Sequence, residues 1–167
     1  MSLGVIPGGD LGTRATIGMM RSLARRGAQD LAVRETAIRV LQASGARGRD
    51  AMAELGALHR FVRDEIRFTG DIRGIETLQS PRYTLSVRAG DCDDKATLLV
   101  SMARAVGIGA DLGFRTVAAN PLRPRSFSHV FVIAVVGGKQ IALDPTYQDT
   151  PMGWQVPAPS RVGDWRV

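Results

Sequence analysis

Gly90-Asp91-Cys92-Asp93-Asp94-Lys95 holds the only cysteine of the chain, and an apolar run follows it as far as Gly107. The apolar residues recur at helical spacing, which predicts a loop that delivers Cys92 onto the first turn of a buried helix. A thiol at a helix N-terminus lies beside unpaired backbone N–H groups and a partial positive charge, and both favour the thiolate. Cys92 is therefore a candidate nucleophile.

Three carboxylates flank this cysteine and bear on its ionisation. Asp91, Asp93 and Asp94 would oppose thiolate formation if all three faced the sulfur. Alternatively, Asp91 is the N-cap of the helix and Asp94 its partner three positions later, so that both turn toward backbone N–H groups. The second arrangement keeps a reactive thiol possible, whereas the first favours a non-catalytic role.

A hairpin predicted downstream brings a histidine and an aspartate together. Residues 127–144 are predicted to form two strands around the turn signal Gly137-Gly138. A turn at the two glycines places Phe131 opposite Asp144, and a turn one residue earlier places His129 there. In both registers His129 and Asp144 share one face as direct or diagonal neighbours, within about 8 Å.

The helix and the hairpin together predict a Cys-His-Asp site. If the small apolar face of the helix packs on the sheet face that carries His129, the thiol and the imidazole can meet. His129 would take the thiol proton and Asp144 would fix the imidazole tautomer, as in other activated thiol nucleophiles. The candidate catalytic residues are therefore Cys92, His129 and Asp144.

The remaining pattern predicts an α+β fold, in which N-terminal helices and a central cysteine-bearing helix pack on a small antiparallel sheet. The other expected elements are helices over residues 13–26, 30–44 and 50–68 and a strand over residues 110–118. His59 lies on the apolar seam of the third helix, and we expect it to be a core-edge histidine.

One domain is expected to account for most of the chain. Its helical part spans residues 13–68, and the core that carries the candidate site spans residues 69–150, so the domain covers 13–150. Residues 1–12 are expected to be a flexible leader, without the features of a signal peptide. Residues 151–167 are expected to form an extended C-terminal tail.

Composition and charge limit the classes of partner. The 167 residues carry a formal net charge of +6, but the scarce aromatic residues are not interleaved with the arginines, so we do not expect nucleic acid as a partner. No apolar run approaches the ~20 residues of a membrane span. A single cysteine excludes an internal disulfide and does not suit a cysteine-based zinc cluster. We expect a reducing, cytoplasmic setting and no metal or cofactor.

The ordered set of motifs resembles the transglutaminase-like superfamily of cysteine hydrolases and acyltransferases. The matching pieces are Gly90-Asp91-Cys92-Asp93-Asp94 at a helix start, Ser128-His129-Val130 in a strand, and Leu143-Asp144-Pro145-Thr146 at the end of the next strand. The upstream run Glu76-Thr77-Leu78-Gln79-Ser80-Pro81 is similar to small stand-alone versions of this domain from bacteria and bacteriophages. The resemblance covers roughly residues 50–150.

This resemblance implies a papain-like or transglutaminase-like core with a triad at Cys92, His129 and Asp144. Attack on an amide would give an acyl-enzyme, which water resolves in a peptidase or amidase and an amine resolves in a transglutaminase. Animal transglutaminases carry Gln before the cysteine and Trp after it, where this chain has Asp91 and Asp93. We expect hydrolysis, with acyl transfer to an amine as the alternative.

Three further residues are weaker candidates for oxyanion or substrate contacts, namely Gln79, Tyr83 and Tyr147. The backbone N–H of Cys92 is another candidate oxyanion donor. The expected substrate is a protein, peptide or peptidoglycan amide, and a phage-type protein would also have virion or assembly proteins as partners. The remaining alternative is a structural or adaptor component of a phage particle that keeps the triad without using it. The expected location is then the phage particle instead of the cytoplasm.

Overall fold

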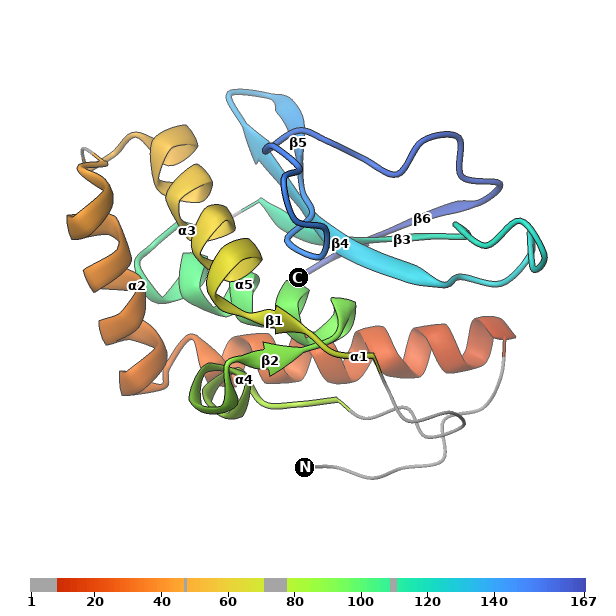
Figure 1. Cartoon of the computed structure of the whole chain (residues 1–167), viewed down its shortest axis with the longest axis horizontal. Helices are drawn as coiled ribbons and strands as arrows, with labels where there is room; N and C mark the ends of the chain where they lie inside the picture. Colours follow the sequence, from red (N-terminus) through yellow and green to blue (C-terminus); the bar gives the residue numbers. More distant parts are fainter. Residues whose placement is uncertain (1–8, 47, 71–77, 109–110) are drawn as a thin grey trace.

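The computed structural model describes residues 9–46, 48–70, 78–108 and 111–167. It confirms the predicted α+β class, with helices gathered on one side of a small antiparallel sheet (Figure 1). In chain order the elements are α1 (Gly9–Gly27), α2 (Leu31–Ser44), α3 (Ala51–Glu65), β1 (Arg67–Phe68), α4 (Pro81–Val87), β2 (Ala89–Gly90), α5 (Cys92–Ala105), β3 (Leu112–Val117), β4 (His129–Val136), β5 (Lys139–Leu143) and β6 (Val162–Arg166).

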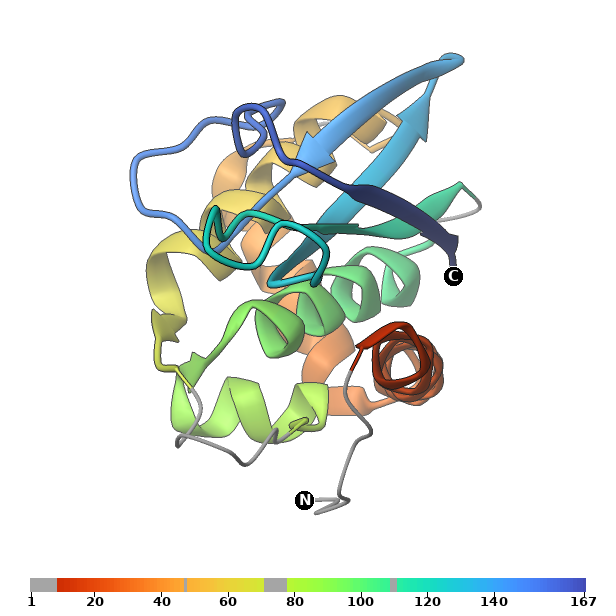
Figure 2. The same ribbon diagram turned by 90° about the vertical axis from the view of Figure 1, so that its right-hand side faces the viewer.

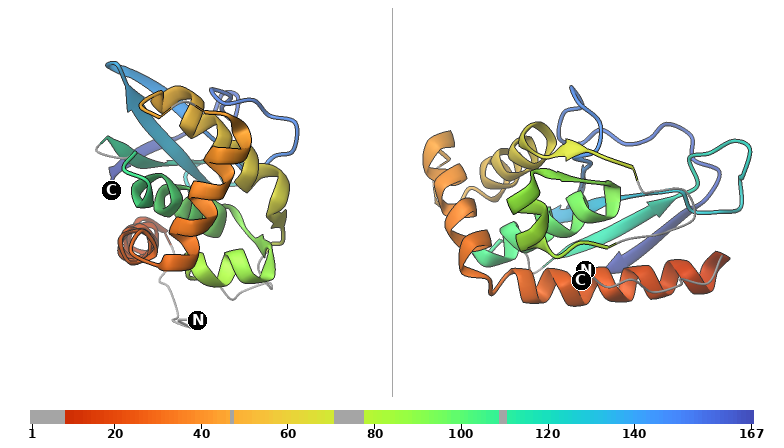
Figure 3. Two further views of the ribbon diagram at one scale, coloured as in Figure 1. Left: turned by 90° about the vertical axis from the view of Figure 1, so that its left-hand side faces the viewer. Right: turned by 60° about the horizontal axis from the view of Figure 1, so that its bottom comes forward.

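The cysteine-bearing helix α5 is the centre of the fold. Helices α1, α2, α3 and α4 pack on it, and β4 covers a further side. Every residue from Asp94 to Ala103 is buried, which explains why the helix is apolar on nearly all faces. Figures 1 and 2 show α5 between the sheet and α1, and Figure 3 shows the surrounding helices from two further sides.

Two aspartates and one glycine set the ends of α2 and α3. The side chain of Asp30 accepts backbone N–H groups at the start of α2, and that of Asp50 does so for α3. Gly45 ends α2 at a φ of 68°, a left-handed conformation that suits glycine. No helix among the described residues combines the length and the apolar character that a bilayer span requires.

The sheet has the strand order β5-β4-β3-β6, with every neighbouring pair antiparallel. Val136 pairs with Lys139 across Gly137-Gly138, and both glycines have positive φ angles, as a tight two-residue turn requires. Continuing this register to the end of β5 places Phe131 opposite Asp144. The hairpin therefore has the first of the two predicted registers.

Two ends of the chain differ from the predicted organisation. Residues 9–12, expected in the flexible leader, are the first turn of α1, while residues 1–8 lie outside the described part. Residues 162–166, expected in an extended tail, form β6 and pair with β3. Gly163 lowers the strand propensity of this run. A glycine is nevertheless needed there, because the Cβ of any other residue would lie only 2.9 Å from Thr116 Oγ1 on β3. Close packing against β3 therefore accounts for a strand with a weak sequence signal.

Candidate active site

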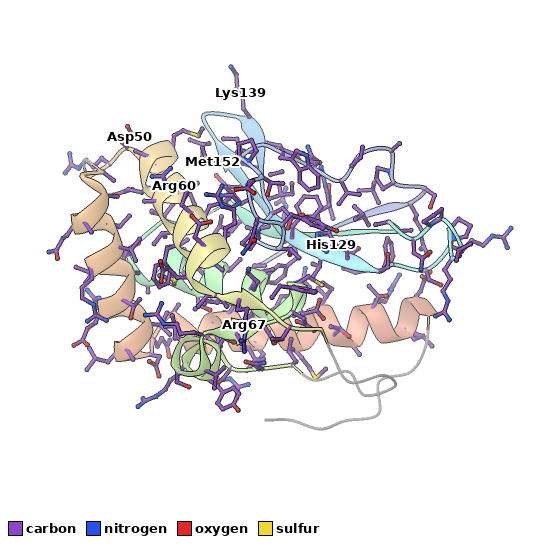
Figure 4. The ribbon with its side chains drawn as sticks, in the orientation of Figure 1. Asp50, Arg60, Arg67, His129, Lys139 and Met152 are labelled. Carbon is purple, nitrogen blue, oxygen red and sulfur yellow. The ribbon has the colours of Figure 1, made fainter. Side chains whose placement is uncertain are left out.

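His129 and Asp144 form a buried pair at one end of the sheet. His129 begins β4, Asp144 follows β5, and His129 Nε2 lies 2.7 Å from Asp144 Oδ2. The two side chains are 6% and 0% exposed. Because an ionised carboxylate only accepts hydrogen bonds, the proton between the two side chains is carried by Nε2. Figure 4 shows His129 well away from the hairpin tip marked by Lys139.

Asp144 is held by two further hydrogen bonds. Its second carboxylate oxygen, Oδ1, accepts the backbone N–H of Thr146 at 3.0 Å. Its backbone oxygen lies 2.9 Å from Nε2 of His59, a buried residue of α3. The carboxylate that faces His129 is thus fixed at both oxygens, and its backbone is fixed as well.

Cys92 lies at the first position of α5 and is half-buried. Cys92 and His129 line the same cavity, which has a volume of about 280 Å³. Val130, the residue after His129, also lines this cavity, and its backbone N–H acts to lower the pKa of the Cys92 thiol. Among the described side chains, no hydrogen bond joins Cys92 and His129, and the thiol donates to Asp93 Oδ1 at 3.4 Å.

The three acids beside Cys92 divide into two groups. Asp91 and Asp94 form a reciprocal capping box, in which each carboxylate accepts the backbone N–H of the other residue. Asp94 also accepts the backbone N–H of Gln79 at 2.7 Å. Asp93 is the acid whose carboxylate faces the thiol. Asp91 and Asp94 thus follow the predicted capping arrangement, whereas the Asp93 carboxylate faces the sulfur and opposes its ionisation.

Burial is the largest cause that raises the pKa of the Cys92 thiol well above its usual value. The charges of Asp93 and Asp91 act in the same direction, while the Val130 N–H lowers the pKa in part. The thiol is therefore protonated in the resting structure. Among the described residues no group of three or more His, Cys, Asp or Glu side chains is placed to hold a metal ion.

Of the three weaker candidates, only Tyr147 lies beside the pair. Its ring centroid is 5.4 Å from that of His129, and Trp154 packs edge-on against it at 5.3 Å. Tyr83 is on α4, is 45% exposed and does not line the cavity. Gln79 and Tyr147 do not line it either. The side-chain Oε1 of Gln79 accepts a hydrogen bond from Thr84 of α4 at 3.3 Å.

The first turns of α1 form a wall of the cavity that the sequence does not reveal. Thr13 and Thr16 line the cavity together with residues 126–130. Arg161 connects α1 with the segment before β4. Its guanidinium contacts both carboxylate oxygens of Asp10 at 2.7 and 2.9 Å and lies 4.4 Å from the ring centroid of Phe127. The cavity that contains Cys92 is therefore bounded in part by α1.

Lys95 is a buried cation one turn after Cys92, and its burial was not expected from the sequence. It is 1% exposed, and its ammonium group donates to the backbone oxygens of Ile66 at 2.7 Å and Arg63 at 3.3 Å. These carbonyls lie at the end of α3, where helix carbonyls lack partners within the helix. Burial lowers the pKa of Lys95 to about 8, although the charges of Asp144 and Asp64 act in the opposite direction.

Lys95 is expected to make the protein more stable as the pH rises. Its pKa is about 8 when folded against 10.5 for the ordinary group, so the cost of burying its charge is present below pH 8 and is relieved above it. Between about pH 7.5 and 9.5 the free energy of unfolding should rise by roughly 1 to 2 kcal/mol. Urea denaturation in a Cys92→Ala background measures this rise without the opposing thiol titration. Lys95→Met should lack the rise, and an equal rise in both proteins contradicts the assignment.

Comparison with known protein families identifies one match. The family model of the transglutaminase-like superfamily matches residues 40–145, a range that contains Cys92, His129 and Asp144 but neither α1 nor β6. A search of curated proteins found no match.

Three similar solved structures come from bacteria. A candidate cysteine protease from Cytophaga hutchinsonii is 20% identical at a TM-score of 0.51, and the match covers 78% of this chain and 42% of that chain. A candidate protease from Parabacteroides distasonis is 15% identical at 0.58, with 83% and 26% covered. LapG from Legionella pneumophila is 15% identical at 0.56, with 88% and 87% covered. The chain thus spans less than half of the first two proteins, and the likeness shows a shared fold.

Proposed function

The chain belongs to the transglutaminase-like superfamily, and from this premise we propose that it is a thiol enzyme that cleaves amide bonds with Cys92, His129 and Asp144. The observation that carries the proposal is the buried hydrogen bond of 2.7 Å between His129 and Asp144, beside a cavity that His129 shares with Cys92. A base with a fixed tautomer next to a sulfur is the arrangement that nucleophilic catalysis requires.

The reaction begins from a protonated thiol. Rotation about the Cα–Cβ bond of Cys92 moves Sγ from Asp93 toward His129, whose Nδ1 takes the proton as the sulfur attacks the amide carbonyl. The carbon–sulfur bond forms and the carbonyl electron pair moves to oxygen. The backbone N–H of Cys92, at the start of α5, supports the proposal as a donor to this oxyanion. Asp144 stabilises the imidazolium through Nε2.

The second step returns the proton to the leaving amine. The oxyanion re-forms the carbonyl, the carbon–nitrogen bond breaks, and His129 protonates the departing nitrogen, which leaves a thioester on Cys92. Water then attacks the thioester with His129 as its base, and the thiol is regenerated. We favour this hydrolytic route, with a protein, peptide or peptidoglycan amide as substrate, over transfer of the acyl group to an amine.

A second candidate is a structural component of a phage particle that retains the fold. The observation that favours it is the half-buried thiol, which is protonated and hydrogen-bonded to Asp93. This candidate predicts that Cys92 is less reactive in the folded protein than a free thiol, because burial hinders both ionisation and access.

Alkylation of Cys92 separates the two candidates without a known substrate. Because Cys92 is the only cysteine, the mass added by iodoacetamide reports on this residue alone. For the enzyme, removal of the thiol proton by His129 during attack outweighs the raised pKa of the resting thiol. We therefore expect the folded protein at pH 7 to react at least about tenfold faster than the urea-unfolded protein. A slower reaction in the folded protein favours the structural role. Incorporation of a primary amine into an acylated protein then separates transfer from hydrolysis.

Asp93→Asn is expected to increase the reactivity of Cys92. In the wild type, the Asp93 carboxylate accepts a hydrogen bond from the thiol and its charge raises the thiol pKa. The substitution removes that charge. We expect alkylation at pH 7 to be roughly 3- to 10-fold faster than in the wild type, since one pKa unit is a factor of ten in thiolate. Asp164→Asn, which removes the same charge from β6, is the matched control and should leave the rate unchanged. An unchanged or slower rate in Asp93→Asn contradicts the assigned role of Asp93.

A further inference from the structure

His59 is a second histidine at the site, and the reaction described above does not use it. It lies on α3 and is 0% exposed. Its Nε2 atom is 2.9 Å from the backbone oxygen of Asp144, although 85 residues separate the two in sequence. Its other ring nitrogen, Nδ1, is buried and has no hydrogen-bond partner among the described residues.

These contacts define the protonation of His59. A carbonyl oxygen only accepts hydrogen bonds, so Nε2 must carry a proton and donate it to Asp144. A proton on Nδ1 as well would bury a charged donor without an acceptor, which is costly. Burial accordingly lowers the pKa of His59, although the hydrogen bond to Asp144 acts in the opposite direction. His59 is therefore a neutral imidazole with the proton on Nε2.

Packing alone does not explain why residue 59 is a histidine, because its Nδ1 atom is buried without a partner among the described residues. A buried polar atom without a partner costs about 1–3 kcal/mol, which an apolar ring of similar size would avoid. Among the described residues, the ring makes one hydrogen bond in exchange, the bond to Asp144. The value of a histidine at this position therefore lies in that bond.

Asp144 lies where the sheet no longer holds the backbone. The paired residues of β5 end at Leu143, and Pro145, which has no N–H, follows Asp144. The carboxylate is oriented by Thr146 and His129, but neither of these bonds holds the Asp144 carbonyl. The hydrogen bond from His59 on α3 supplies that restraint.

We propose that His59 is a positioning residue, whose Nε2–H fixes the backbone of Asp144 and thereby holds the carboxylate against His129. The inference rests on the proposed function, because it assigns His59 a part in activating Cys92. His59 touches neither Cys92 nor the substrate in this role. Its effect passes through the geometry of the Asp144–His129 hydrogen bond.

Two substitutions test this role. His59→Phe keeps an aromatic ring but removes the donor, whereas His59→Gln places an amide N–H at about the reach of Nε2. Val62→Ala is the control, since it removes packing from a fully buried position of the same helix without removing a hydrogen-bond donor. The chain has two histidines, so His129 is the sole histidine in both His59 variants and its Nε2–H resonance can be followed by NMR without ambiguity.

His59→Phe is expected to lower the rate of Cys92 alkylation at pH 7 about tenfold and to broaden the Nε2–H resonance of His129 by faster exchange with water. His59→Gln should keep the rate within about threefold of the wild type and retain a sharp resonance. The proposal is overturned if His59→Phe behaves like the wild type in both measurements, or if Val62→Ala reproduces its losses.

Two further arms keep the test decisive. If His59→Phe does not fold, His59→Asn replaces it, because its shorter amide cannot reach the Asp144 carbonyl and should show the same losses relative to His59→Gln. If wild-type Cys92 is no more reactive than the unfolded thiol, the proposed function fails. The NMR comparison then still decides whether His59 holds the Asp144–His129 pair, since that measurement does not depend on the thiol.

Discussion

His129→Ala is expected to lower the rate at which Cys92 is acylated by a p-nitrophenyl ester about 10²- to 10⁴-fold at pH 7. The variant lacks the imidazole that Asp144 positions, so the protonated thiol loses its base. The raised pKa of Cys92 then keeps the thiolate fraction small. Release of p-nitrophenol, followed in a stopped-flow spectrometer, measures the acylation rate. An ester with this leaving group needs no acid, so the measurement isolates the role of His129 as base.

A loss of folding would mimic this effect, so stability is measured alongside it. His129 is 8% exposed, and its removal leaves a small gap at the start of β4. His129→Gln, which keeps a polar side chain of similar length, should be as slow as His129→Ala because an amide is not a base. If either variant folds and acylates within threefold of the wild-type rate, His129 is not the base.

Asp144→Asn is expected to lower the same rate about 10²- to 10⁴-fold, although the two side chains have almost the same shape. The carboxylate fixes the proton on His129 Nε2, and its charge stabilises the imidazolium that forms during attack. An amide supplies no charge and can present N–H to Nε2, which favours the wrong tautomer and leaves Nδ1 protonated. The base would then be absent even with the ring in place.

The NMR spectrum of His129 distinguishes this explanation from a general loss of structure. In Asp144→Asn we expect the ring proton to move from Nε2 to Nδ1 in long-range ¹H–¹⁵N correlation spectra, while His59 keeps its proton on Nε2. Asp164→Asn, which removes a carboxylate from β6, should change neither the tautomer nor the acylation rate. An acylation rate in Asp144→Asn equal to that of the wild type would contradict the assigned role of Asp144.

The parts of the site that the sequence predicts depend on local geometry. The turn at Gly137-Gly138 determines which residues of one hairpin share a face, so the approach of His129 to Asp144 follows from counting residues. The capping box at the start of α5 involves residues three positions apart and is equally local. Both features form independently of how the helices pack on the sheet.

The parts that the sequence does not predict depend on contacts between distant segments. The sequence predicts His59 at the edge of the core, whereas the structure buries it completely, and its bond to Asp144 requires α3 to pack beside the end of β5. A lone Lys95 next to two acids has the pattern of a solvated residue, and only the packing of α5 against the end of α3 buries it. The wall that α1 adds to the cavity is likewise a product of tertiary packing.

The most direct test of the central claim is to locate the acyl group after reaction with the p-nitrophenyl ester. The protein is quenched in acid within seconds, and its intact mass and peptide masses are measured. The account predicts one acyl group per chain on Cys92 in the wild type, none in Cys92→Ala, and far slower labelling in His129→Ala and Asp144→Asn. Failure of the folded wild type to form an adduct, or an adduct on another residue, would contradict the assignment of Cys92 as the nucleophile.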